Sequence, residues 1–304
     1  MPCALTHAAG AGANSCWATH TGVQGATGIT EAQIIANPGA AGFTVHKGDL
    51  TITQSNTTID HEWITGCVTI ADGANNVTIK DSLITPEGDS CRGDNSGGSA
   101  VQTGQGPNIG ENTIVEDTTI DGVYGYNPTY GNHDVGITLD GGEVLRVNLF
   151  GFGIGYLSNT NTADDPAIYQ DDYGHDYYGC AHDDGTWFDS SAYITFNHGW
   201  IMTNDPTQPN SSEGCSTAAL AGGDDGGPGE PQDHVIIENS YGEGVTGEDT
   251  HWGCGAVNSA FLNNALSTDA KDQATEFGSA AKGNTWSGNT VAETGAAVPA
   301  PAPC

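Results

Sequence analysis

Positive charge is scarce in this chain. Its 304 residues hold 6 Lys and Arg against 38 Asp and Glu, which gives a formal net charge of −32 at pH 7. A surface with this charge repels nucleic acid and anionic lipid. No apolar run is long enough to span a bilayer, and neither the HExxH nor the CxxC motif occurs. We therefore expect no nucleic-acid partner, no membrane partner, and neither of the metal or redox sites that those motifs mark.

Helical periodicity is also nearly missing. One segment, Thr30 to Ala36, suits a short helix, with Thr30 as its N-cap and Asn37-Pro38-Gly39 as its stop. It stands before the first of the repeats described next. The open apolar end of a repeat protein needs an atypical cap, so the interpretation of residues 1–48 is an N-terminal entry and cap.

What the chain does have is a repeated unit of two short apolar runs around an Asn or Asp. The spacing between successive copies is 21 to 25 residues, or 31, 36 and 42 where a loop is inserted. A steady period of this size predicts a solenoid. Asn and Asp tolerate left-handed backbone angles, so they suit a sharp corner between two strands. The expected corner residues are Asp60, Asp81, Asp117, Asn148, Asp172, Asn197, Asn239, Asn264 and Asn289.

The predicted fold class is all-β, a right-handed parallel β-helix of about nine coils. It spans 49–292, after the entry segment 1–48 and before a C-terminal tail 293–304. Its core should include an aligned stack of Ile79, Val115, Ile237 and Leu262. An antiparallel β-sandwich also has short, evenly spaced strands. It is disfavoured because it gives no reason for one residue type to recur at the corners.

Eight cysteines are spread along the chain. An even number without metal-binding spacing favours disulfides formed in an oxidising compartment. All eight are expected to be bonded. Cys67 and Cys91 lie about one coil apart, as do Cys180 and Cys215, so these pairs could join neighbouring coils. We expect a secreted monomer whose leader peptide has been removed.

Several segments at the start of the repeat region support a family resemblance. They are Ala18-Thr19-His20-Thr21-Gly22-Val23, Gly48-Asp49-Leu50-Thr51-Ile52-Thr53, Thr58-Ile59-Asp60, Ile64-Thr65-Gly66-Cys67 and Asn76-Val77-Thr78-Ile79-Lys80-Asp81-Ser82. The chain resembles secreted bacterial right-handed parallel β-helix proteins of the pectin-lyase-like superfamily. The resemblance implies that fold and secretion. It does not choose an activity, because the superfamily includes lyases, glycoside hydrolases, epimerases, adhesins and phage tailspikes.

A longer signature occurs twice, 49 residues apart. The stretch from His133 to Asp140 matches the stretch from His182 to Asp189, as HDxGxxxD. The offset corresponds to two coils, which places the copies on one face about 9.6 Å apart. Strand alternation points Asp140, Trp187 and Asp189 outward. Two carboxyls at roughly this distance suit an inverting glycosidase, and an outward indole suits stacking on a sugar.

These patterns predict a site in three parts. The catalytic candidates are Asp140, Asp189, Asp183 and His182. The substrate-binding candidates are Trp187, Tyr130, His133, Trp252 and His251. The metal candidates are Asp134, Asp184 and Asp249, whose carboxylates suit calcium as the one expected cofactor. The alternative is that these aspartates only end strands and cap turns.

The expected partner is a polysaccharide, and three functions fit it. The first is a polysaccharide (glycoside) hydrolase that uses paired aspartates in a groove. The second is a calcium-assisted polysaccharide lyase, disfavoured because the charge of −32 repels a polyanionic substrate. The third is a non-catalytic glycan-binding or surface solenoid. The polysaccharide itself cannot be named from the sequence.

Overall fold

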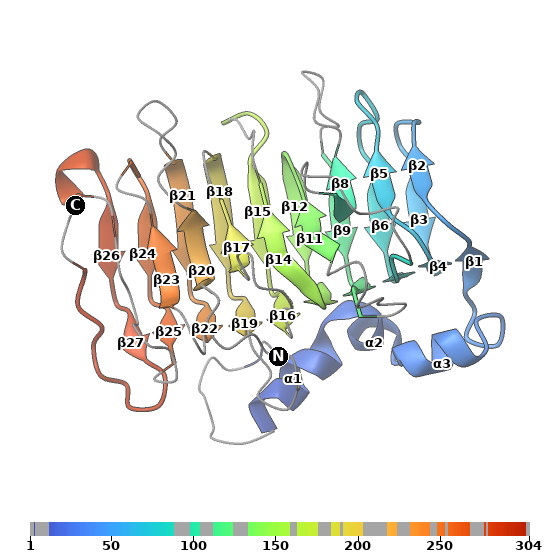
Figure 1. The fold of residues 1–304 in the computed structure, drawn as a ribbon, viewed down its shortest axis with the longest axis horizontal. Helices are drawn as coiled ribbons and strands as arrows, with labels where there is room; N and C mark the ends of the chain where they lie inside the picture. Colours follow the sequence, from blue (N-terminus) through green and yellow to red (C-terminus); the bar gives the residue numbers. More distant parts are fainter. Residues whose placement is uncertain are drawn as a thin grey trace.

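The chain coils into a parallel β-helix with three long faces (Figure 1). The structure is a computed structural model, and it describes residues 3, 12–87, 98–103, 112–123, 133–158, 163–175, 184–188, 191–202, 218–223, 232–243, 248–252, 255–267, 277 and 279–301. Strands that follow one another in the chain lie in different sheets. Each strand pairs in parallel with the strand one coil away, as in β1–β4, β2–β5 and β3–β6. The predicted parallel β-helix is therefore confirmed.

In the described part of the chain, sheet A has ten strands. They are β1 (Thr44–His46), β4 (Glu62–Ile64), β7 (Leu83–Ile84), β10 (Thr119–Asp121), β13 (Asn148–Phe150), β16 (Tyr173–His175), β19 (Trp200–Met202), β22 (Tyr241–Glu243), β25 (Ala265–Leu266) and β27 (Thr290–Val291).

Among the residues that the structure describes, sheet B has eight strands and sheet C has nine. The strands of sheet B are β2 (Leu50–Ile52), β5 (Val68–Ile70), β8 (Ser99–Thr103), β11 (His133–Thr138), β14 (Phe152–Leu157), β17 (Asp184–Trp187), β20 (Ala218–Gly223) and β23 (Glu248–Trp252). Those of sheet C are β3 (Thr58–Asp60), β6 (Thr78–Lys80), β9 (Ile114–Glu116), β12 (Gly142–Leu145), β15 (Ala167–Gln170), β18 (Ala192–Asn197), β21 (Asp233–Glu238), β24 (Ala260–Leu262) and β26 (Thr285–Ser287).

The corner from sheet C to sheet A is sharp, and one residue in it has a positive φ. The nine residues are His61, Asp81, Asp117, Arg146, Asp171, His198, Asn239, Asn263 and Gly288. The prediction of an Asn or Asp corner is right at Asp81, Asp117 and Asn239. It is wrong at Asn148 and Asn197, which lie in strands, because Arg146 and His198 take the turn. It is wrong by one position at Asp60, Asp172, Asn264 and Asn289.

At several corners the next residue is polar and buried, and together these residues form a second ladder. The side-chain carbonyl of Asn264 accepts a hydrogen bond from the Ser240 backbone N–H at 2.9 Å, and that of Asn289 accepts one from the Asn264 backbone N–H at 2.9 Å. A carboxyl oxygen of Asp172 accepts one from the Val147 backbone N–H at 2.8 Å. These side chains satisfy backbone donors at the bend, where no strand neighbour can do so.

The core runs along the inside of the coils. In sheet C the inward column follows the strand register and consists of Ile79, Val115, Val144, Tyr169, Phe196, Ile237 and Phe261. The expected stack of Ile79, Val115 and Ile237 is thus confirmed. The prediction that Leu262 belongs to the stack was wrong by one position. Phe261 occupies the column, and Leu262 lies half-buried on the other side of the strand.

Three helices precede the coils: α1 (Gly12–His20), α2 (Gly22–Thr27) and α3 (Glu31–Ala36). The predicted helix after Thr30 is α3, and Thr30 forms a capping box with Gln33. The helices lie along sheet A and not over the open end (Figure 1). Ile34 packs with Leu83 of β7 on the outer side of that sheet. The first strand begins at Thr44, inside the segment expected to be entry and cap.

The C-terminal residues fold back onto the last coil. Val298 is buried with the core, and its carbonyl accepts a hydrogen bond from the Trp286 indole N–H at 3.0 Å. Ala297 forms an antiparallel bridge with Thr290. Up to residue 301 the segment expected to be a tail therefore covers the end of the solenoid. Among the described helices, none has the length and apolar character needed to cross a membrane.

Candidate functional site

The loop insertions flank sheet B. In the connection from sheet C to sheet A, β24 ends at Leu262 and β25 begins at Ala265, and the other coils are as short. By contrast, β19 ends at Met202 and β20 begins only at Ala218, so a long segment enters sheet B. Long segments also leave it, as between Leu157 of β14 and Ala167 of β15. Sheet B is therefore bordered on both sides by connections whose length differs from coil to coil. Loops of this kind are where ligand-binding sites most often form.

The strand register aligns the two copies of the HDxGxxxD signature. Val135 of β11 pairs through β14 with Asp184 of β17, and Thr138 pairs through Leu157 with Trp187. Both offsets are 49 residues. The prediction that the copies occupy equivalent places two coils apart is confirmed for these described positions.

Trp187 lies on the outer side of sheet B. Its neighbour Phe188 is fully buried, with its ring 5.5 Å from that of Tyr169 and 6.5 Å from that of Phe196. Alternation along the strand then turns Trp187 outward, and its side chain is half-buried. Leu157 is its neighbour in the same row and is also half-buried.

The outer row continues on both sides of Trp187. Toward the N-terminal coils the register leads through Thr138, which is only 1% exposed, and Gln102 to Thr69, and the Gln102 amide donates a hydrogen bond to the Thr69 hydroxyl at 3.2 Å. Toward the C-terminal coils Thr186 pairs with Leu220, so the next backbone positions along the row are Ala221 and its partner His251. We call this line from Thr69 to His251 the sheet B row. It joins two substrate-binding candidates, Trp187 and His251, that are distant in sequence.

Asp140 and Trp252 do not lie where the sequence suggested. Asp140 is 2% exposed, and its backbone N–H donates a hydrogen bond to the Thr103 hydroxyl at 3.0 Å. It was expected to point outward, but β11 ends at Thr138 and the alternation does not extend into the bend. Trp252 is fully buried in the core, with its ring 5.3 Å from that of Phe277. The prediction that it is a surface platform for sugar is wrong, because its ring packs inside the core against Phe261 and Phe277.

Asp184 is also buried. One of its carboxyl oxygens accepts a hydrogen bond from the Ala218 backbone N–H at 3.0 Å, which links β17 to β20. This described contact is structural, and the role of Asp184 as a calcium ligand stays a prediction. So do the roles of His133, Asp134 and Asp249, whose positions lie in β11 and β23 and whose side chains are not described. Tyr130, His182, Asp183 and Asp189 lie outside the described residues.

The corner between sheets C and A carries an ionic row that the sequence reasoning missed. The Arg146 guanidinium binds both carboxyl oxygens of Asp117, at 2.8 and 2.7 Å, and reaches Glu116 at 3.3 Å. The hydrogen bonds from Arg146 to Asp117 and the nearby negative charges raise the pKa of the guanidinium. A signal was present in the sequence: Arg146 is one of only 6 basic residues and stands at a repeat corner.

The same row contains a His and Asp cluster. Asp60, His61 and Asp81 place their ligand atoms within 4.8 Å of one another. Lys80 Nζ, however, lies 3.3 Å from Asp60 and 4.0 Å from Asp81. The hydrogen bond from His61, followed by the contact with Lys80, lowers the pKa of Asp60. This cluster therefore already contains its own cation and does not need a metal ion.

Disulfides appear at both places where cysteines are described. Cys3 is bonded to Cys16, a pair that the sequence reasoning did not anticipate. Cys67 is also disulfide-bonded, as predicted, and no described cysteine is free. The proposed pairings with Cys91, and of Cys180 with Cys215, involve residues outside the described part.

Comparisons with known proteins give little beyond the fold. No protein-family model matches the chain, and no curated protein matches it. A solved structure that it resembles is the Azotobacter vinelandii mannuronan C-5 epimerase AlgE6 A-module. The identity is 13%, the match covers 88% of this chain and 94% of that chain, and the TM-score is 0.28. We draw no function from so weak a similarity, and the fold is established by the three parallel sheets themselves.

Proposed function

We propose that the protein is a secreted carbohydrate-active protein that binds a polysaccharide along the sheet B row and hydrolyses it. The observation that supports this most is the half-buried Trp187 on the outer side of sheet B, in register with the first copy of a duplicated His-Asp signature. An indole stacks on the apolar face of a pyranose, and polar neighbours hydrogen-bond its hydroxyl groups.

Because Asp140 is buried, it is no longer proposed as one of the two catalytic carboxyls. The proposed acid and base now come from Asp183, Asp189 and His182 in the second copy of the signature. The negative charge of a neighbouring carboxylate raises the pKa of a carboxyl group. The group then keeps a proton that it can donate to the leaving oxygen. The net charge of −32 favours a neutral polysaccharide, unless calcium bound by Asp134 and Asp249 screens a polyuronate.

Glycan binding without catalysis is the second candidate. The observation that favours it is again Asp140, which is 2% exposed and so leaves one carboxyl of the expected pair off the surface. A calcium-assisted lyase ranks third, because an acidic surface opposes a polyanionic substrate.

The test is a panel of neutral and acidic polysaccharides. New reducing ends without an unsaturated product would support hydrolysis, an unsaturated product would support elimination, and binding without products would support the second candidate. Trp187→Ala should weaken binding of the best polysaccharide roughly tenfold. Tyr193→Ala is the matched control, because Tyr193 is a half-buried aromatic residue of sheet C.

Asp189→Asn then separates binding from chemistry. In a hydrolase it should abolish turnover and leave binding and melting temperature nearly unchanged. If Trp187→Ala binds the polysaccharide as tightly as the parent, and Tyr193→Ala does too, the sheet B row is not the binding site.

A further inference from the structure

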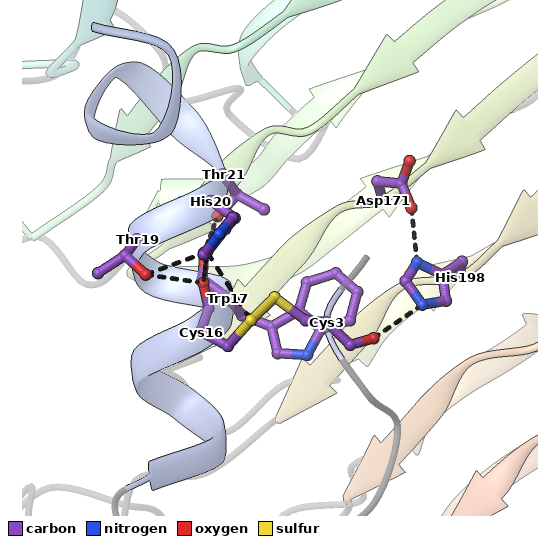
Figure 2. Close-up of a disulfide and its surroundings, with 8 residues drawn as sticks. All are labelled: Cys3, Cys16, Trp17, Thr19, His20, Thr21, Asp171 and His198. Atoms are coloured by element: carbon purple, nitrogen blue, oxygen red, sulfur yellow. Dashed lines mark hydrogen bonds and ion pairs between the residues drawn. A yellow bond between two sulfur atoms is a disulfide. The ribbon is translucent and has the colours of Figure 1, made fainter. Parts of the chain in front are cut away.

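The N-terminal part of the chain is fastened to the outer side of sheet A. Cys3 is 6% exposed and is bonded to Cys16 of α1, so Cys3 and the helix are held together (Figure 2). Trp17 of α1 packs between the solenoid and Cys3, with ring centroids 6.1 Å from Trp200 and 5.1 Å from His198. We call Cys3 together with α1 the clasp.

His198 joins the clasp to the solenoid through both ring nitrogens. Nδ1 lies 2.5 Å from a carboxyl oxygen of Asp171, and Nε2 lies 3.0 Å from the backbone carbonyl oxygen of Cys3 (Figure 2). The carbonyl can only accept, and the carboxylate accepts as well, because the hydrogen bond from His198 lowers the pKa of Asp171. A neutral imidazole has a single N–H. Both bonds together therefore require a ring with two protons.

We propose that His198 is a pH-sensitive latch that holds the clasp on the solenoid in acid and loosens it as the pH rises. The protonated ring donates to Asp171 and to Cys3 at once. When the ring loses a proton, the remaining N–H stays with the charged Asp171, because a charge-assisted hydrogen bond is the stronger one. The bond to Cys3 is then lost, and the clasp is held by the packing of Cys3 and Trp17 against the aromatic rings of sheet A.

The charges around the ring support this direction. Asp171 stabilises the protonated ring directly. Arg146 at the neighbouring corner also lowers the pKa of Asp171 and so helps to keep this carboxyl charged. On α1, His20 is exposed, and its Nδ1 lies 2.8 Å from the Cys16 carbonyl oxygen. Beneath the clasp, sheet A presents Trp200 and other aromatic rings.

The test is backbone hydrogen exchange of residues 12–20 at pH 5 and pH 8, with labelling times matched to the intrinsic exchange rate. In the unmodified protein, exchange should be roughly tenfold faster at pH 8. His198→Gln should exchange at one rate at both pH values. His234→Gln is the matched control, because His234 also has a positive φ and lies 2.6 Å from an aspartate, Asp233.

Two further measurements keep the proposal open to refutation if His198→Gln does not fold. Asp171→Asn removes the charge that favours the protonated ring, so faster exchange should begin at a lower pH. NMR titration of the His198 ring should show a midpoint that coincides with the change in exchange. Exchange that is the same at both pH values in the unmodified protein, or midpoints that differ by more than a pH unit, would overturn the latch.

Discussion

Replacing Asp172 with asparagine should make the protein more stable at neutral pH. Asp172 follows a corner and is fully buried, in the same ladder as Asn264 and Asn289. One of its carboxyl oxygens accepts the Val147 N–H, and the other, Oδ2, has no hydrogen-bond partner among the described residues. Burial, opposed by the hydrogen bond from Val147, raises the pKa of Asp172 well above its usual value. Folding therefore favours the protonated form of this carboxyl.

The asparagines of the ladder show what the substitution gains. Asn264 uses its carbonyl as Asp172 does and donates from its amide to the Ile237 carbonyl at 3.0 Å. Asn289 donates in the same way to the Phe261 carbonyl at 2.9 Å. An asparagine at position 172 makes the acceptor bond without binding a proton and supplies a donor as well. One hydrogen bond contributes about 1 kcal/mol.

The sign of the pH dependence follows from linkage. A carboxyl whose pKa is raised by folding contributes its full stability below its ordinary pKa of 3.8. That contribution is lost by about 1.4 kcal/mol for each pH unit above this, until the raised pKa is reached. Asp172→Asn should therefore add about 1 kcal/mol at pH 4, and the gain should grow as the pH rises toward 7.

The assay is urea unfolding of both proteins from pH 4 to pH 8. Asn264→Asp is the reverse control, and it should lose stability increasingly as the pH rises. A variant less stable than the parent at pH 7 would refute the reasoning, as would a gain that is the same at every pH. Either result would mean that the buried carboxyl finds a donor or stays charged.

Three further variants test the N-terminal segment. Burial and then the hydrogen bond with Asp121 raise the pKa of Glu31 to about 9. The contribution of Glu31 to the free energy of unfolding is therefore full below pH 4.5 and is lost as the pH rises toward 9. In calorimetry, Glu31→Gln should be more stable than the parent by roughly 1–3 kcal/mol at pH 8 and little changed at pH 4. Cys3→Ser opens a disulfide with a sequence separation of 13 and should cost about 3 kcal/mol in urea unfolding. Gly22 has φ +61, and a Cβ there would lie 2.4 Å from Thr119 Oγ1, so Gly22→Ala should lower stability by at least ~2 kcal/mol in the same assay.

The fold was predictable because one physical requirement repeats in every coil. Ile79 and Val115 belong to one inward column, and each marks a strand with a corner after it. The corner residue itself was less predictable. A left-handed angle favours Asn, Asp or Gly only moderately, so Arg146 and His198 adopt it where other contacts compensate.

The site was harder to predict, for reasons that particular residues show. The 49-residue offset located Trp187 correctly, because a repeat fixes register over any distance. Asp140 was misplaced, since strand alternation says nothing about a residue beyond the end of its strand. The disulfide from Cys3 to Cys16 was missed because the chain before the coils has no period from which its position could be read.

The N-terminal helices change how the solenoid should behave as a whole. In a simple repeat array each coil contacts only its neighbours, so the ends can open alone. Here Ile34 of α3 packs against Leu83 of β7, while Trp17 of α1 packs with Trp200 of β19. One short segment thus contacts early and late coils, and opening a late coil disturbs the packing of α1. Any change that loosens the clasp, including loss of a proton from His198, should therefore make unfolding less cooperative along the whole solenoid.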